Sequence, residues 1–150
     1  MKRAIFPGTF DPFTIGHYNL VMRGLDIFDE IIIGIGVNLS KKTLFDAGKR
    51  IDIIRQAFSN EPRVRVMTYD SLTVDFAASV EAKYILRGLR TVSDFEYEHT
   101  IANANRQLNG LETVVLFTET EYSFISSTVV RDLIAYRKDI TAFLPPHVKL

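Results

Sequence analysis

Short apolar runs alternate with longer amphipathic segments from one end of the 150-residue chain to the other. In the segments between the runs, apolar residues such as Leu20, Val21 and Phe28 recur at three- and four-residue steps, which is the spacing of a helix that covers a sheet. The runs are apolar throughout, as in strands that are buried on both faces. This pattern predicts an α/β protein: a single-domain Rossmann-like fold with a five-stranded parallel sheet flanked by helices. The five predicted strands span residues 4–6, 30–37, 63–67, 84–86 and 113–117.

Two local signals place helices more closely. The tetrapeptide Ser-Asp-Phe-Glu at residues 93–96 has the form of a capping box, which predicts that a helix begins there. The final helix is predicted over about residues 127–136, with Val130 and Ile134 on its apolar face. No repeat, low-complexity tract or linker interrupts the chain, so residues 1–150 are expected to form one domain.

Composition narrows the possible functions. The 18 basic and 18 acidic residues balance, so no overall field favours a nucleic acid or an anionic membrane, and an anionic ligand must be met by a local cluster. The absence of cysteine excludes disulfides, thiol nucleophiles and cysteine-ligated zinc. Pro7 and Gly8 interrupt the first apolar stretch too early for a signal peptide, and no stretch approaches the roughly 20 apolar residues of a membrane span. We therefore expect a cytoplasmic protein whose partners are neither nucleic acid nor membrane.

The loop at residues 7–17, Pro-Gly-Thr-Phe-Asp-Pro-Phe-Thr-Ile-Gly-His, joins the first predicted strand to the first helix. Such a loop is an anion site because free N–H groups and the positive end of the helix dipole point to one place. Gly8 and Gly16 permit close backbone approach, Thr9 adds a hydroxyl donor, and His17 can aim its imidazole at the same anion. The sequence therefore predicts a phosphate-binding loop with a built-in histidine.

Cationic and hydroxyl side chains follow three other predicted strands. Lys41 and Lys42 come after the second strand, and Arg87 and Arg90 flank a Gly-Leu pair after the fourth. A Tyr-Ser-Phe-Ile-Ser-Ser-Thr run at residues 122–128 leads into the last helix. Because ligands bind at the carboxyl ends of parallel strands, all four segments should open at the same edge of the sheet. Guanidinium and ammonium groups suit phosphate oxygens, so we expect a clamp for a triphosphate and a second phosphorylated group.

Some of these features have a simpler interpretation. A lysine pair is often only a solvated surface pair, and a Ser-Ser-Thr run is often only a helix cap. Asp11 offers a carboxylate for a metal or a ribose, but Asp before Pro is also ordinary turn chemistry. The Gly-Ile-Gly at residues 34–36 resembles the start of a dinucleotide fingerprint, but it lies inside a strand and Leu39 stands where the third glycine should be. We interpret that tripeptide as structural.

The sequence shows no Ser-His-Asp arrangement, no cysteine nucleophile and no pair of catalytic carboxylates. Catalysis without a protein nucleophile favours direct phosphoryl-type transfer. In such a reaction, positioning and charge stabilisation supply the rate.

At these residues the chain resembles a known family. The Gly-Thr-Phe-Asp-Pro segment that closes on Gly16-His17 resembles the nucleotidyltransferase signature of the Thr/His-x-Gly-His type. Three segments narrow the resemblance to the bacterial phosphopantetheine adenylyltransferases, over residues 2 to about 148: Arg-Gly-Leu-Arg at 87–90, Asp-Phe-Glu-Tyr-Glu at 94–98 and Ser-Phe-Ile-Ser-Ser at 123–127. The resemblance implies transfer of AMP from ATP to 4′-phosphopantetheine, which gives dephospho-coenzyme A and pyrophosphate in coenzyme A biosynthesis. It also implies Mg²⁺ with the ATP.

The resemblance implies roles for particular residues. His17 would stabilise the transition state, with Lys41 and Arg90 as further catalytic residues. No protein ligand for the metal is evident, and we expect ATP phosphates and water to hold the Mg²⁺. The residues implied for phosphopantetheine are Thr9, Lys41, Thr73 and Arg87. Those implied for ATP are Thr9, Phe10, His17, Gly88, Leu89, Arg90, Glu98, Tyr122, Ser123, Phe124, Ile125, Ser126, Ser127 and Thr128.

The chain departs from the family pattern at three places. Tyr122 stands where many relatives have tryptophan, and Thr73 occupies a position that is often apolar. The chain also ends soon after the Pro-Pro-His at residues 145–147. The family forms hexamers, so we expect a homo-oligomer, a hexamer, with some apolar surface at its interfaces.

Two other functions remain open at this point. One is an adenylyl- or cytidylyltransferase with nicotinamide mononucleotide or a glycerol phosphate as acceptor, against which the 87–90 segment argues. The other is a non-catalytic module that senses ATP or coenzyme A. Such a module would bind adenine nucleotides without releasing pyrophosphate.

Overall fold

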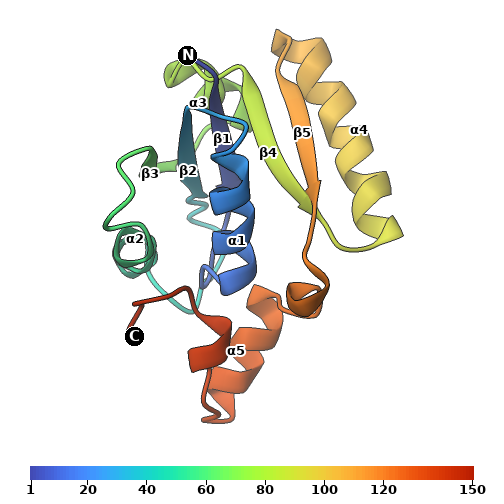
Figure 1. Cartoon of the computed structure of the whole chain (residues 1–150). Helices are drawn as coiled ribbons and strands as arrows, with labels where there is room; N and C mark the ends of the chain where they lie inside the picture. The colour runs from blue at the N-terminus through green and yellow to red at the C-terminus, as the bar shows by residue number, and fades with distance from the viewer.

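The computed structural model, which describes residues 1–150, contains one sheet of five parallel strands. Their order in space is β3-β2-β1-β4-β5, which confirms the predicted five-stranded parallel sheet (Figure 1). The fourth strand continues three residues beyond its predicted end. The strands are β1 (Arg3–Gly8), β2 (Glu30–Gly36), β3 (Val64–Tyr69), β4 (Tyr84–Leu89) and β5 (Glu112–Phe117).

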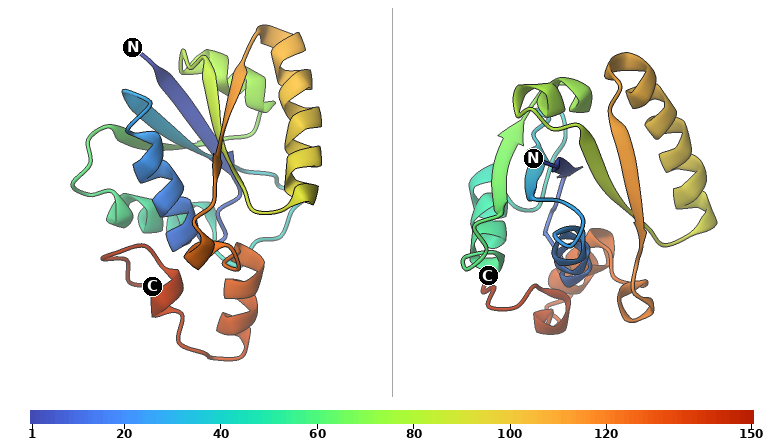
Figure 2. Two further views of the ribbon diagram at one scale, coloured as in Figure 1. Left: turned by 45° about the vertical axis from the view of Figure 1, so that its right-hand side comes forward. Right: turned by 45° about the horizontal axis from the view of Figure 1, so that its top comes forward.

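Helices cover the two faces of this sheet and one of its edges. The helices are α1 (Ile15–Gly24), α2 (Ala47–Ala57), α3 (Thr73–Ser79), α4 (Val92–Asn109) and α5 (Ser127–Ala135), with short 3₁₀ turns η1 (Thr120–Tyr122) and η2 (Thr141–Phe143). Helices α1 and α2 pack on one face, α3 and α4 lie on the other, and α5 lies beyond the carboxyl ends of the strands (Figures 1 and 2). None of these helices combines the length and the apolar character needed to cross a membrane.

The core divides into two layers because strand side chains alternate between the faces of the sheet. In β1, Ala4 and Phe6 belong to the cluster under α1 and α2, whereas Ile5 packs with Val74 and Phe76 of α3. The central strands β1 and β2 are buried on both faces, as predicted. The edge strands β3 and β5 are not, since they alternate between exposed and half-buried residues.

The start of α4 differs from the prediction. Thr91 caps the helix, since its hydroxyl accepts a hydrogen bond from the Asp94 N–H at 3.1 Å, and the helix begins at Val92. The expected capping box at residues 93–96 is therefore wrong by two residues. Both positions offer a hydroxyl three residues before an acid, but Thr91 lies closer to the end of β4 and is used.

The order of the strands reverses between β1 and β4. The chain moves outward through β2 and β3, then returns to the other side of β1 and moves outward again through β5. A parallel sheet has its ligand crevice at such a reversal, outside the carboxyl ends of the strands. The loops after β1 and β4 therefore meet where a site is expected.

Candidate active site

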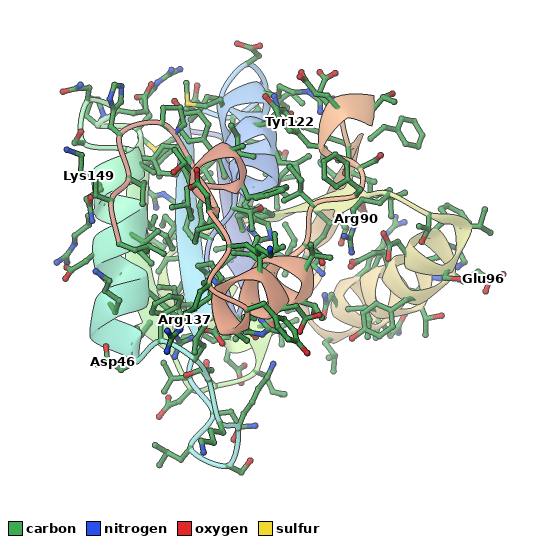
Figure 3. All side chains as sticks on the ribbon, turned by 90° about the horizontal axis from the view of Figure 1, so that it is seen from below. Asp46, Arg90, Glu96, Tyr122, Arg137 and Lys149 are labelled. Atoms are coloured by element: carbon green, nitrogen blue, oxygen red, sulfur yellow. The ribbon has the colours of Figure 1, made fainter.

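A cleft of about 460 Å³ opens at this reversal of strand order. It lies between the loops after β1, β2 and β4 and the start of α5, so the four segments expected at one edge are brought together. Figure 3 looks onto this edge, with Arg90 and Tyr122 labelled. The predicted site residues that line the cleft are Thr9, Phe10, His17, Lys41, Arg87, Gly88, Arg90, Glu98, Tyr122, Ile125, Ser126, Ser127 and Thr128.

Four predicted site residues do not line this cleft. Leu89 is buried at the end of β4, and the Phe124 side chain is largely exposed. Ser123 uses its hydroxyl to donate to the Thr120 carbonyl at 2.9 Å, within the turn η1. Thr73 lies in a second cavity, described below.

His17 is held at the start of α1 by a reciprocal capping arrangement. The N–H of Thr14 donates to Nδ1 of His17 at 2.9 Å, and the N–H of His17 donates to the Thr14 hydroxyl at 3.4 Å. Because Nδ1 accepts a backbone hydrogen bond, the proton of the neutral ring resides on Nε2. The cap therefore sets the tautomer of His17 and leaves Nε2 as a hydrogen-bond donor.

The imidazole of His17 is neutral over the whole physiological range. Burial of the ring is the largest cause and the positive charges of Arg90 and Arg87 add to it; together they lower the pKa of His17 from 6.5 to about 3. A charged imidazole would add a third cation beside two guanidinium groups in a partly dry site, so the neutral form is favoured.

Aromatic rings fix the orientation of His17. Phe10 packs edge-on against the imidazole with ring centroids 5.0 Å apart, and Phe13 lies at 5.1 Å. The Phe10 side chain is buried, which gives it a supporting role for the histidine beneath the cleft. Its predicted contact with ATP stays a prediction.

Lys41 reaches across the cleft to the loop after β1. Its Nζ donates to the Thr9 hydroxyl at 3.1 Å. Thr9 and Lys41, two of the four residues that the resemblance assigned to phosphopantetheine, are thus neighbours, although 32 positions separate them in sequence. Lys41 is exposed, and its role at the acceptor phosphate stays a prediction.

Arg87 is held between two acceptors. Its Nε and Nη2 contact the carboxylate of Glu98, at 3.0 Å and 2.6 Å, and its Nη1 donates to the Pro7 carbonyl at 2.8 Å. Glu98 is the only buried residue of the long helix α4. The sequence prediction placed Glu98 with ATP and Arg87 with phosphopantetheine, whereas the structure joins them in one ion pair.

The start of α5 supplies a second helix N-terminus to the cleft. Ser126 caps the helix by accepting from the Val129 N–H at 3.2 Å, and the Ser127 hydroxyl donates to the Pro12 carbonyl at 2.8 Å. The interpretation of this run as a helix cap is therefore confirmed for Ser126. The first N–H groups of a helix lack intrahelical partners, so α1 and α5 both present anion-binding ends here.

Two glycines at the cleft are required by packing. A Cβ on Gly8 would lie 2.8 Å from the ring of Phe10, and a Cβ on Gly88 would collide with the side chain of Leu20 in α1. The bare backbone at these positions lets Phe10 and α1 approach the sheet. Close approach of a phosphate to the same glycines stays a prediction.

A second cavity of about 190 Å³ adjoins the cleft on the face of the sheet covered by α3 and α4. Pro7, Gly8, Arg87 and Glu98 line both spaces. Its other lining residues include Tyr69, Thr73, Tyr97, Ile101, Asn105 and Thr113.

The second cavity carries hydroxyl groups as well as apolar walls. The Tyr69 hydroxyl lies 3.2 Å from that of Thr73, and the buried hydroxyl of Thr113 has no hydrogen-bond partner. Of these three hydroxyl groups, sequence reasoning found only that of Thr73, because Tyr69 of β3 and Thr113 of β5 belong to no motif.

Sequence reasoning also missed Arg131, which lines the cleft. Its Nη1 donates to the Asp11 carbonyl at 2.8 Å, and its Nη2 donates to the Thr128 hydroxyl at 3.1 Å. Its place three residues after Thr128, on the same side of α5, was the available signal.

Asp11 was considered for a metal or a ribose, but its carboxylate accepts two backbone hydrogen bonds from the loop after β2.

The fold and the cleft define the class of protein. The model of the family described as cytidylyltransferase-like matches residues 5–133. Proteins named phosphopantetheine adenylyltransferase from Phocaeicola vulgatus and Bacteroides fragilis are 58% and 56% identical over 150 residues, which is all of this chain and 99% and 100% of theirs. One from Flavobacterium johnsoniae is 47% identical, over 100% of this chain and 99% of its own. The chain therefore belongs to the cytidylyltransferase-like family and, within it, to the phosphopantetheine adenylyltransferases.

Solved structures of more distant proteins share the fold. The chain is similar to a bifunctional NMN adenylyltransferase/ADP ribose pyrophosphatase from Francisella tularensis, with a TM-score of 0.75 and 13% identity. The match covers 95% of this chain and 44% of that chain. A structure of that enzyme complexed with AMP and a Mn ion has a TM-score of 0.70. These matches support the Rossmann-like architecture predicted from the sequence.

The state of His17 can be measured directly. With ¹⁵N-labelled histidine, long-range ¹H–¹⁵N NMR should show His17 neutral with its proton on Nε2 from about pH 8 to about pH 4. In the unfolded chain His17 takes up a proton near pH 6.5, whereas in the folded chain it does so only near pH 3. The free energy of unfolding should therefore decrease as the pH falls from about 6.5 to about 3. Protonation of His17 near pH 6.5 would contradict the assignment.

Proposed function

We propose that this adenylyltransferase of coenzyme A biosynthesis joins ATP to 4′-phosphopantetheine by a direct in-line displacement, without a covalent enzyme intermediate. The observation that carries the mechanism is the capped, neutral His17 at the positive end of α1, in a cleft that also holds Lys41, Arg87 and Arg90. This set of groups can position and neutralise phosphates, and it contains no activated nucleophile.

In the proposed reaction an oxygen of the phosphopantetheine phosphate attacks the α-phosphorus of ATP. The new P–O bond forms as the bond to the β-phosphate oxygen breaks, and pyrophosphate leaves with that electron pair. The attacking phosphate is already anionic near neutral pH, so no general base is needed. Nε2–H of His17 and the N-terminus of α1 stabilise the charge on the α-phosphate, while Lys41 and Arg90 neutralise the approaching anions.

The two cavities support a placement for the two substrates. ATP would occupy the larger cleft, between the start of α1, the end of β4 and the start of α5. The acceptor phosphate would lie near Thr9, Lys41 and Arg87, where the cavities adjoin. The pantetheine arm would enter the second cavity beside Thr73, where hydroxyl groups can bond to its amides. Phosphopantetheine, with a phosphate at one end and amide groups along its arm, suits a cationic junction that opens into a cavity with hydroxyl groups.

Mg²⁺ is proposed to enter with ATP as part of the substrate. No three metal-ligating side chains gather anywhere in residues 1–150, so the chain offers no cluster of its own for the ion. ATP phosphates and water are suitable ligands, because Mg²⁺ commonly keeps several waters and binds substrate phosphates.

We further propose that the single domain, residues 1–150, works in the cytoplasm as a homo-oligomer, a hexamer by resemblance to the family. The support is α4, an 18-residue helix that buries only Glu98. A large exposed apolar surface commonly marks an interface. The exposed apolar residues on α4 and the adjacent strand β5 are Val92, Phe95, Tyr97, Ile101, Leu108, Val115 and Phe117.

The choice of acceptor is the primary test of function. Pyrophosphate release from MgATP would be measured with 4′-phosphopantetheine, with nicotinamide mononucleotide or with no acceptor. Release only with phosphopantetheine, together with dephospho-coenzyme A by mass spectrometry, is expected. Release with another acceptor would overturn the substrate, and ATP binding without any release would favour a sensor module.

Loss of the His17 donor should act on the chemical step. We expect His17→Ala to lower kcat by ~10²–10³ with a smaller effect on KM for ATP. His17→Gln, whose side-chain N–H reaches a similar place, should lose less, and His147→Ala at an exposed site should behave as wild type. A His17→Ala enzyme with most of its kcat would contradict the role of His17.

The α4–β5 surface can be tested by light scattering after size-exclusion chromatography. The wild-type chain should have six times the mass of one chain. Phe95→Glu combined with Phe117→Glu should reduce that mass, because charges would be placed on the proposed interface. Leu39→Glu, at a fully exposed residue elsewhere, is the control. A monomeric wild-type protein would exclude the proposed assembly.

A further inference from the structure

We propose that Asp11 is a positioning residue that holds Lys41 in place over the acceptor phosphate. It would do so by anchoring the loop between β2 and α2, residues 37–46, here called the β2–α2 loop. The inference rests on the proposed function, in which Lys41 contacts that phosphate.

The Asp11 carboxylate is enclosed and fully occupied. Asp11 is only 4% exposed, and its two oxygens accept the N–H groups of Leu44 and Phe45 at 2.8 Å and 2.9 Å. A buried carboxylate is costly unless such donors replace its water. Both donors lie in the β2–α2 loop, three and four residues after Lys41. The carboxylate therefore binds this loop to the loop after β1.

Arg50 of α2 strengthens the same junction. It is also 4% exposed, and its guanidinium donates to the Phe45 carbonyl at 3.1 Å and to the Thr9 carbonyl at 2.9 Å. Thr9 is the residue whose hydroxyl accepts from Lys41. Arg50 thus ties the end of the β2–α2 loop to the residue that Lys41 must reach.

Arg131 of α5 also contacts Asp11. Its Nη1 donates to the Asp11 carbonyl at 2.8 Å and lies 4.0 Å from the carboxylate. Asp11 therefore joins the loop after β1, the β2–α2 loop and α5. None of these three segments is adjacent to another in sequence, so the contacts at Asp11 set their relative positions.

Between Asn38 and Lys42, the β2–α2 loop is held mainly by hydrogen bonds within itself, in which the N–H groups of Ser40 and Lys41 donate to Asn38. Leu39 is fully exposed and Ser40, Lys41 and Lys42 are exposed as well. In Figure 3 the loop projects from the body of the molecule and returns to it near Asp46. A lysine on such a segment has many conformations, and a fixed anchor close to it narrows them. Loss of the anchor should weaken the hold of Lys41 on the acceptor while the nucleotide site stays intact.

The first test is Asp11→Asn, which keeps the shape but turns one acceptor into a donor that faces an N–H group. We expect KM for 4′-phosphopantetheine to rise about tenfold, KM for ATP to stay at the wild-type value, and hydrogen exchange of residues 38–46 to accelerate. Asp29→Asn, which removes an exposed carboxylate that accepts from the Lys2 N–H at 2.6 Å, should leave both KM values and the hydrogen exchange of residues 38–46 unchanged. Unchanged loop exchange and acceptor KM in Asp11→Asn would overturn the inference.

A double-mutant comparison separates positioning from general damage. If Asp11 acts through Lys41, Asp11→Asn with Lys41→Ala should be no worse for the acceptor KM than Lys41→Ala alone. If the two substitutions raise the acceptor KM independently, so that their fold-changes multiply in the double variant, the inference would be overturned. If Asp11→Asn does not fold, Arg50→Lys provides the second variant, because a lysine cannot bridge the Phe45 and Thr9 carbonyls as the guanidinium does.

The outcomes also distinguish this inference from the proposed function. Failure of the wild-type enzyme to use phosphopantetheine would overturn the proposed function, and loop exchange would still decide whether Asp11 anchors the loop. A normal wild-type reaction with an unaffected Asp11→Asn enzyme would overturn only the role of Asp11.

Discussion

The cleft exists because β1 and β4 pair only at their beginnings. Their register joins Ala4 to Tyr84 and Ile5 to Ile85 and goes no further, whereas β1 pairs with β2 along its whole length. Figure 1 shows β4 leaning away from β1 toward its carboxyl end. Beyond the paired residues, the Arg87 side chain bridges the two strands by donating to the Pro7 carbonyl at 2.8 Å. The Arg87 guanidinium thus links β1 to β4 where their backbones no longer pair, and it lines both cavities.

Most of the fold and the outline of the site could be predicted from the sequence. The apolar runs at the central strands are unambiguous because those strands are buried on both faces. Four polar segments at strand ends must then converge, since parallel strands end at one edge. His17 was expected at the start of the first helix, and the structure confirms that location by capping the helix with Thr14 and His17.

The pairing of the charges could not be predicted from the sequence. Glu98 is the single buried residue of an otherwise exposed helix, and nothing in its sequence neighbourhood indicates that it binds Arg87. Asp11 was ambiguous for a similar reason: a carboxylate before a proline suits a turn, a metal or a ribose. Only the packing of the β2–α2 loop against it shows that its oxygens are occupied. Long-range contacts of this kind depend on the assembled fold, whereas caps and strand ends are local.

Arg87 and Arg90 are held in place before any substrate arrives. Arg87 is fixed by Glu98, and the Arg90 guanidinium donates to the Ile125 carbonyl at 3.4 Å and lies 3.6 Å from the Asp94 carboxylate. Groups that are already oriented need little reorganisation when charge develops, which is the condition for effective electrostatic catalysis. The imidazole is buried beside these two positive charges, so its neutral form is favoured. The division of roles follows: the arginines supply charge, and His17, with its tautomer set by the Thr14 N–H, supplies a directed hydrogen bond.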